Sequence, residues 1–273
     1  MFVLFQLLVY PGLLWVGIVS LVLETALGRS THREGTLSKT WQALRGHGSL
    51  AHAVSIVLGL VALGLLPWPA TPAGPLPNFD RWRLWAFTEA CFLAALLPGL
   101  TSSSPLMNRA AVREAQIGVS GRTVLWIALY SGLGATNTTV LGLIPTLVGT
   151  FVALCALPAA AGWQPFGGES GLGLGDVDAY LHPGDRVVAG WARDLRSILL
   201  IALVATVFVS APQLVWWQQL GIKLWLALAV ALVGRSLRGA SIHRPIGDAL
   251  QFCWRWILPS ALLAVVSRIW IGN

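Results

Sequence analysis

Long apolar runs separated by short polar gaps make up most of this chain. Eight of these runs are long enough to span a bilayer, at 3–24, 50–67, 84–104, 114–135, 138–161, 192–211, 213–234 and 249–270. A membrane-spanning helix needs about 20 predominantly apolar residues. The pattern therefore predicts an all-α integral membrane protein with about eight transmembrane helices and an amphipathic segment after the first.

The composition agrees with this prediction. Hydrophobic residues make up 56% of the 273 residues, charged residues only 11%, and the mean hydropathy is +0.72. Soluble domains carry about 25% charged residues, so the chain falls in the membrane class. Its net charge of +7 comes from bases gathered in the gaps between apolar runs. We therefore expect a lipid bilayer around the chain and no nucleic-acid partner.

We expect one membrane domain over residues 1–273. Its parts are a first helix at 1–24, an amphipathic cytoplasmic segment at 25–49, helices 2–5 at 50–161, a cytoplasmic loop at 162–191 and helices 6–8 at 192–273. The first run lacks the basic start and the small-residue cleavage site of a signal peptide. Its length also spans a bilayer, so we expect a retained helix.

The bases predict the orientation of the helices. Most of them lie in the gaps after the first, third, fifth and seventh predicted helices. Cytoplasmic loops carry an excess of Lys and Arg. The chain is therefore expected to be a multi-pass protein of the inner (cytoplasmic) membrane, with both termini on the non-cytoplasmic side.

Acidic residues at helix ends and inside helices are the first candidates for chemistry. Glu24 ends the first predicted helix, and Glu89 lies isolated within an apolar run. Glu114 leads into the fourth helix and Asp194 into the sixth. Ionisable residues in membrane helices usually face a bundle interior or a water-filled cavity. Each is a candidate proton carrier, and the sequence leaves a structural role open as well. That role would be a neutral hydrogen-bonded core residue for Glu89, an Arg–Glu pair for Glu114, and an interfacial helix end for Glu24 and Asp194.

Four further acids, Glu169, Asp176, Asp178 and Asp185, lie in the polar segment before the sixth helix. Asp176 and Asp178 form a close acidic pair. Carboxylates together with substrate phosphates hold Mg²⁺ in many enzymes. An integral membrane transferase acting on a diphosphate is therefore a minor alternative, because no repeat or second acidic pair accompanies this one.

Three cations are candidate intramembrane charges, because they lie well inside predicted helices: Arg122, Lys223 and Arg255. A charge in lipid costs several kcal/mol, so each of them needs a partner. The three cysteines are far apart and form no C-x-x-C motif. We therefore expect this chain to hold no iron–sulfur cluster and no metal of its own.

The order of the motifs is more specific than any one of them. In sequence they are Glu24-x-x-x-Gly-Arg, Arg113-Glu-Ala-Gln116, Pro165-Phe166, Val188-Ala-Gly190 before Asp194, Arg235-Ser-Leu-Arg238, Arg244-x-x-x-Asp248 and Trp254-Arg255-Trp-Ile-Leu-Pro259. This order resembles, over nearly the whole chain, the complex I subunit 1 family that forms the quinone site. The resemblance is nearer to the relatives of that family in formate hydrogenlyase and energy-converting membrane-bound nickel–iron hydrogenases.

The resemblance implies a membrane-anchor and ion-coupling subunit of a redox complex, itself not a redox enzyme. Its partners would be an iron–sulfur small subunit, a hydrogenase-like large subunit, and antiporter-like and small membrane subunits. An iron–sulfur cluster, with a nickel–iron site or a quinone, would lie in or next to those partners. Electron transfer there would be linked to proton or sodium translocation.

The resemblance also assigns roles to residues. Docking of the hydrophilic arm would involve Arg29, Arg33, Arg113, Arg235, Arg238, Arg244 and Asp248. The candidate proton path would comprise Glu24, Glu89, Glu114, Glu169, Asp176, Asp178, Asp185 and Asp194. Basic loops on one face are also what docking of an acidic partner requires electrostatically.

The chain departs from the family pattern at several positions. Arg122 stands where the family has a carboxylate, and a Gly-rich insertion at Gly167-Gly168 interrupts the acidic loop. These departures favour the hydrogenase side of the family as a divergent branch. The alternative is the quinone-site subunit of a respiratory NADH dehydrogenase. A small-molecule permease is less favoured, because the sequence shows no internal repeat.

Overall fold

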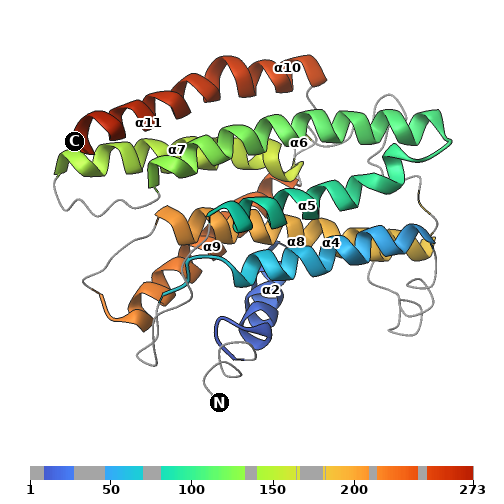
Figure 1. Cartoon of the computed structure of the whole chain (residues 1–273), viewed down its shortest axis with the longest axis horizontal. Helices are drawn as coiled ribbons and strands as arrows, with labels where there is room; N and C mark the ends of the chain where they lie inside the picture. The colour runs from blue at the N-terminus through green and yellow to red at the C-terminus, as the bar shows by residue number, and fades with distance from the viewer. Residues whose placement is uncertain are drawn as a thin grey trace.

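The computed structural model describes residues 9–27, 47–69, 81–132, 140–163, 165–166, 181, 183–208, 214–238 and 245–272. Throughout these segments the regular structure is helical, and they contain no strand (Figure 1). The predicted all-α fold class is therefore confirmed.

The helices follow one another as long rods. They are α2 (Leu13–Leu27), α4 (His47–Gly64), α5 (Arg81–Leu100), α6 (Pro105–Gly132), α7 (Val140–Ala161), α8 (Pro183–Phe208) and α9 (Trp216–Arg238). The last rod is continuous and consists of α10 (Ile246–Gln251), the π-helical segment η3 (Phe252–Ile257) and α11 (Leu258–Gly272). Within the described segments these make eight rods, the number that the apolar runs predict.

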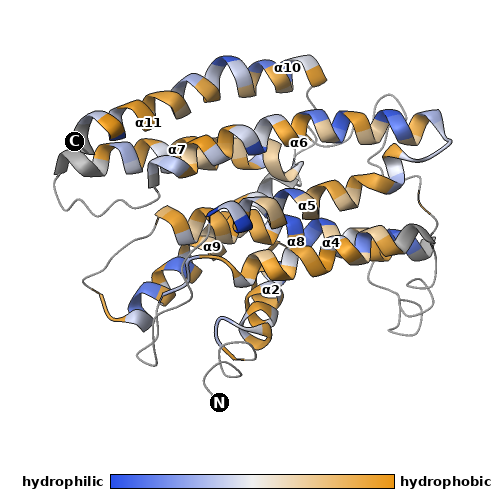
Figure 2. Ribbon diagram, in the orientation of Figure 1, coloured by the Kyte–Doolittle hydropathy of each residue, from blue (hydrophilic) through white to orange (hydrophobic). Residues whose placement is uncertain are grey.

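The lengths and compositions of the helices identify a multi-pass membrane protein. Four segments of the described chain are long and apolar enough to cross a bilayer: Arg81–Leu100, Ile144–Ala161, Trp216–Ser236 and Ile246–Trp270. Leu13–Leu27 and Leu50–Gly64 are shorter apolar helices. Both α6 and α8 carry more polar residues, and Figure 2 shows hydrophilic positions along α6 in particular. Large apolar side chains such as Phe151 and Trp225 cover the outer surface, as expected for contact with lipid.

The core of the bundle lies around α8. Its residues from Ile198 to Ala205 are almost completely buried, and α8 packs against α4, α9, α7 and α5. The helices α6, α7 and α11 pack closely with one another and form a second group beside it (Figure 1). The helix α8 is therefore surrounded by protein, which allows it to carry charged residues without exposing them to lipid.

Glycines allow two of the closest contacts between helices. A Cβ atom at Gly121 of α6 would overlap the backbone of Ala160 in α7. A Cβ atom at Gly234 of α9 would lie 2.6 Å from the ring of Trp163, whose Nε1 donates to Ser197 Oγ at 3.1 Å. Small residues that let helix backbones approach are typical of membrane bundles.

Three predicted helix boundaries differ most from the helices of the structure, each for a local reason. Residues 9–12 belong to the first apolar run but are not helical, because Pro11 disfavours the helical conformation of the residue before it. The helix α6 begins at Pro105 instead of near 114, and α8 begins at Pro183 instead of near 192. Proline is favoured in the first turn of a helix, so both helices start outside their apolar runs.

Candidate functional site

An ion pair between a buried arginine and a half-buried glutamate joins α5 to α6. Arg122 of α6 is only 4% exposed, and its Nε lies 2.9 Å from Oε2 and 3.1 Å from Oε1 of Glu89 in α5. Trp126 donates from Nε1 to the same Oε1 at 3.1 Å. The isolated carboxylate and the intramembrane cation predicted from the sequence are therefore partners of one another.

A second ion pair continues from the first through an aromatic ring. The guanidinium carbon of Arg122 lies 4.1 Å from the centroid of the Phe92 ring, and that of Arg196 lies 5.3 Å from it. Arg196, on α8, is also buried, and its Nη1 lies 3.4 Å from Oε1 of Glu114 on α6. We call the series Glu114, Arg196, Phe92, Arg122, Glu89 and Trp126 the charged column.

Helical spacing explains how the sequence builds this column. Phe92 lies three residues after Glu89, and Trp126 lies four residues after Arg122, so each pair shares one helix face. Gly118, one turn before Arg122, leaves room for the guanidinium, since a Cβ there would lie 2.9 Å from Nη1. The consecutive helices α5 and α6 then bring the two faces together.

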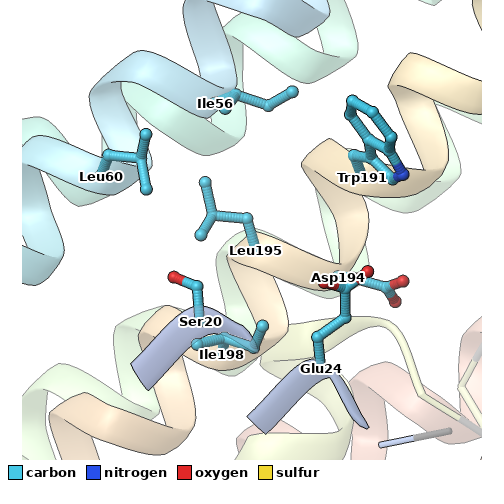
Figure 3. A pocket seen from close by; sticks show the side chains of 8 residues that line it. All are labelled: Ser20, Glu24, Ile56, Leu60, Trp191, Asp194, Leu195 and Ile198. Carbon is cyan, nitrogen blue, oxygen red and sulfur yellow. The ribbon is translucent and has the colours of Figure 1, made fainter. Parts of the chain in front are cut away.

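An acid-lined recess lies on the other face of α8. Its volume is about 190 Å³, and its lining residues are Ser20, Glu24, Ile56, Leu60, Trp191, Asp194, Leu195 and Ile198. Figure 3 shows Glu24 of α2 pointing toward Asp194 of α8, with the apolar side chains of α4 opposite. Two of the predicted proton-path carboxylates, far apart in the sequence, are therefore neighbours at one end of an otherwise apolar cavity.

The other two predicted intramembrane cations have different surroundings. Lys223 of α9 is buried and donates from Nζ to the carbonyl oxygen of Pro67 at 2.9 Å. Arg255 lies exposed on η3, between the exposed side chains of Trp254 and Trp256. Trp254 donates from Nε1 to Ser120 Oγ at 3.2 Å and so anchors η3 to α6.

The remaining predicted residues are dispersed or lie outside the described chain. Asp185 is in the first turn of α8, Arg113 is half-buried on α6, and Arg235 and Asp248 are exposed near the ends of α9 and α10. The side chain of Arg238 and the whole of Arg29, Arg33, Glu169, Asp176, Asp178 and Arg244 lie outside the described residues. Among the residues that the structure does describe, no three His, Cys, Asp or Glu side chains gather closely enough to hold a metal ion.

Sequence analysis missed Phe92, Trp126 and Arg196 as parts of the site. A search for aromatic residues three or four positions from each intramembrane charge would have found the first two. Arg196 stands two residues after Asp194. Its pairing with Glu114 depends on how α8 packs against α6, so no local signal indicates it.

These features define a class: a multi-pass helical membrane protein with paired charges inside its bundle. The sequence matches no protein-family model and none of the curated proteins. Among solved structures, the fold is similar to a chain in the structure of the membrane-bound sulfane sulfur reductase (MBS), an archaeal respiratory membrane complex. The TM-score is 0.67 at 15% sequence identity, over 93% of this chain and 96% of that chain. At this identity the match shows a shared fold.

Proposed function

We propose that this protein is a membrane-anchor and ion-coupling subunit of a respiratory-type redox complex, related to complex I and the membrane-bound hydrogenases. The observation that carries the proposal is the fold. It matches, over almost the full length of both chains, a chain from an archaeal respiratory membrane complex. The order of motifs in the sequence, which resembles the complex I subunit 1 family, supports the same assignment independently.

In this assignment the chain docks the soluble electron-transfer subunits and holds no redox centre itself. An iron–sulfur small subunit and a hydrogenase-like large subunit bind at the basic side, and antiporter-like and small membrane subunits lie beside it in the inner membrane. The exposed Arg235 at the end of α9 is a docking candidate. Complementary charges at the edge of a protein–protein interface mainly steer association and orient the partner.

A quinone-site subunit of a respiratory NADH dehydrogenase is the second candidate function. The recess beside Asp194 favours it, because apolar side chains such as Ile56 and Leu60 line one wall and two carboxylates lie at one end. Ligand sites commonly combine an apolar lining with a few polar groups that fix orientation. A quinone has an apolar tail and a polar head, so the tail could lie against the apolar wall and the head near the two carboxylates.

The experiment that tests the proposal is purification of the tagged chain from its native membrane in mild detergent. We expect iron–sulfur and hydrogenase-like subunits to co-purify, with nickel and iron in the sample. The same partners with quinone-linked activity but no nickel would favour the second candidate. A chain that purifies alone as a stable monomer contradicts both.

Charge reversal at two arginines tests whether the soluble subunits dock at the end of α9. With Arg235→Glu and Arg238→Glu together, we expect recovery of the soluble subunits to fall about tenfold, equivalent to about 1.4 kcal/mol of binding free energy. The matched control is Arg81→Glu with Arg83→Glu, at the exposed start of α5 on the predicted opposite side of the membrane. Equal losses from both pairs would contradict docking at the end of α9.

A further inference from the structure

The charged column runs along the axis of α6. Glu114 and Trp126 mark its two ends on this helix. At a rise of 1.5 Å per residue, the distance between them is about 18 Å. The hydrocarbon core of a bilayer is about 30 Å thick, so the column is more than half as long as this core is thick.

The column has the wrong chemistry for a proton path. A proton relay needs groups that gain and lose a proton, and a guanidinium stays charged at physiological pH. Arg122 interacts electrostatically with Glu89 on α5, Arg196 on α8 and Glu114 on α6. Both carboxylates of the column are paired with guanidinium groups.

The column also ends against an apolar layer. Beyond Arg122 along the helices, Leu84 of α5 and Leu125 and Leu129 of α6 have no exposed surface. Between Trp126 and Tyr130, which lies near the end of α6, this helix carries no titratable side chain. There Arg268 of α11 binds the carbonyl oxygens of Tyr130 and Ser131. These statements concern the described residues of α5, α6 and α11.

We infer that Arg122 is a proton barrier: paired with Glu89 and held against Phe92, it closes the membrane interior of this chain to protons. A fixed cation repels an incoming proton, and the low dielectric constant of the bundle strengthens that repulsion. Contacts with Glu89 and Phe92 hold the guanidinium in place, and the missing side chain of Gly118 leaves room for it.

With Arg122 as a barrier, protons cannot pass between the two polar regions of the molecule. The recess with Glu24 and Asp194 lies on one face of α8, and the column lies on the other. Protons that reach the recess do not continue through the column. In the proposed complex, ions therefore cross the membrane through other subunits. The barrier itself does not depend on which soluble partners bind.

Passive proton flux tests the barrier without any redox reaction. The purified protein, together with any subunits that co-purify, is reconstituted in vesicles that contain a pH-sensitive dye, and a potassium diffusion potential drives protons inward. We expect Arg122→Gln and Arg122→Glu to raise the flux at least about tenfold over the wild type, corresponding to about 1.4 kcal/mol of barrier. Arg122→Lys keeps the cation, so its flux should equal that of the wild type.

The matched control is Lys223→Gln, which removes a similarly buried cation outside the column. Its flux should also stay at the wild-type level. Unchanged flux in folded Arg122→Gln and Arg122→Glu would overturn the inference, as would a tenfold rise in Arg122→Lys. If these single variants do not fold, Arg122→Gln combined with Glu89→Gln removes the cation without leaving Glu89 unpaired. Its flux should rise in the same way, and an unchanged flux would overturn the inference. Failure of partners to co-purify would contradict the proposed function and leave this result unaffected.

Discussion

At the scale of single residues, Glu89 and Arg122 show how an apolar bundle tolerates opposite charges. Both carboxylate oxygens of Glu89 accept a hydrogen bond from Arg122, and one of them also accepts from Trp126. The guanidinium faces an aromatic ring as well, which is a favourable position for a cation. Such a pair need not stabilise the fold relative to apolar residues, but the loss of either partner leaves an uncompensated charge.

Substitution of one partner should therefore lower the free energy of unfolding more than substitution of both. We expect Arg122→Met to lower the free energy of unfolding by about 1–3 kcal/mol, because the half-buried carboxylate of Glu89 loses its charged partner and two hydrogen bonds. The double variant Arg122→Met with Glu89→Leu should recover a large part of this loss. Denaturant unfolding in detergent, followed by tryptophan fluorescence, measures all three proteins. Additive losses in the double variant would show that the two residues are not coupled.

The identities of the site residues were more predictable than their pairing. Glu89, Glu114 and Arg122 stand out in the sequence because charges inside apolar runs are rare and need partners. Which charge meets which depends on helix packing, and Glu114 pairs with Arg196 from 82 positions away. For Glu169, Asp176 and Asp178 the predicted proton-path role stays a prediction, because they lie outside the described residues.

At the scale of elements, the contact between α6 and α7 depends on small residues. Gly121 stands next to Arg122, so the helix face beside the charged column is also the face that approaches α7 most closely. A side chain there would meet backbone atoms of Ala159 and Ala160, which cannot rotate away. This crossing therefore fixes the position of α6 relative to the bundle and, with it, the position of Arg122.

We expect Gly121→Ala to destabilise the protein by about 1–3 kcal/mol, the usual cost of overpacking a close contact. The matched control is Gly221→Ala in α9, where an added Cβ meets nothing within 4 Å. Alanine is the better helix former, so this control should be neutral or more stable by up to about 1 kcal/mol. Thermal unfolding in detergent compares the two. Equal effects would show that the α6–α7 contact is not restrictive.

The apolar runs predict the existence of the helices better than their ends. The helix α8 begins at Pro183, well before its apolar stretch, because the polar segment from Asp185 to Asp194 is compatible with a helix. High hydropathy indicates which part of a helix contacts lipid, whereas capping residues and prolines determine where the helix begins. The polar first half of α8 is also the part that brings Asp194 to the recess.

At the scale of the whole molecule, α8 divides the bundle into two polar regions. Asp194 and Ile198 lie four residues apart and face the recess, while Arg196 points from the opposite face of the same helix to Glu114. Asp194 and Arg196 are only two positions apart in the chain, so the sequence alone would suggest one cluster. Their separation follows from which helices surround α8, and a single sequence does not contain that information.

The orientation of the bundle gives the last prediction. Arg81 at the start of α5 and Arg235 near the end of α9 are both exposed, and the five helices α5 to α9 run between them. An odd number of crossings places them on opposite sides of the membrane, and the excess of bases predicts that Arg235 is cytoplasmic.

In a background with Cys91, Cys155 and Cys253 replaced by Ala, we expect an impermeant maleimide to label Arg81→Cys on intact cells. Arg235→Cys should react only after permeabilisation. The opposite pattern would reverse the predicted orientation. Labelling of both from outside would show that one of the two more polar helices, α6 or α8, does not cross the membrane.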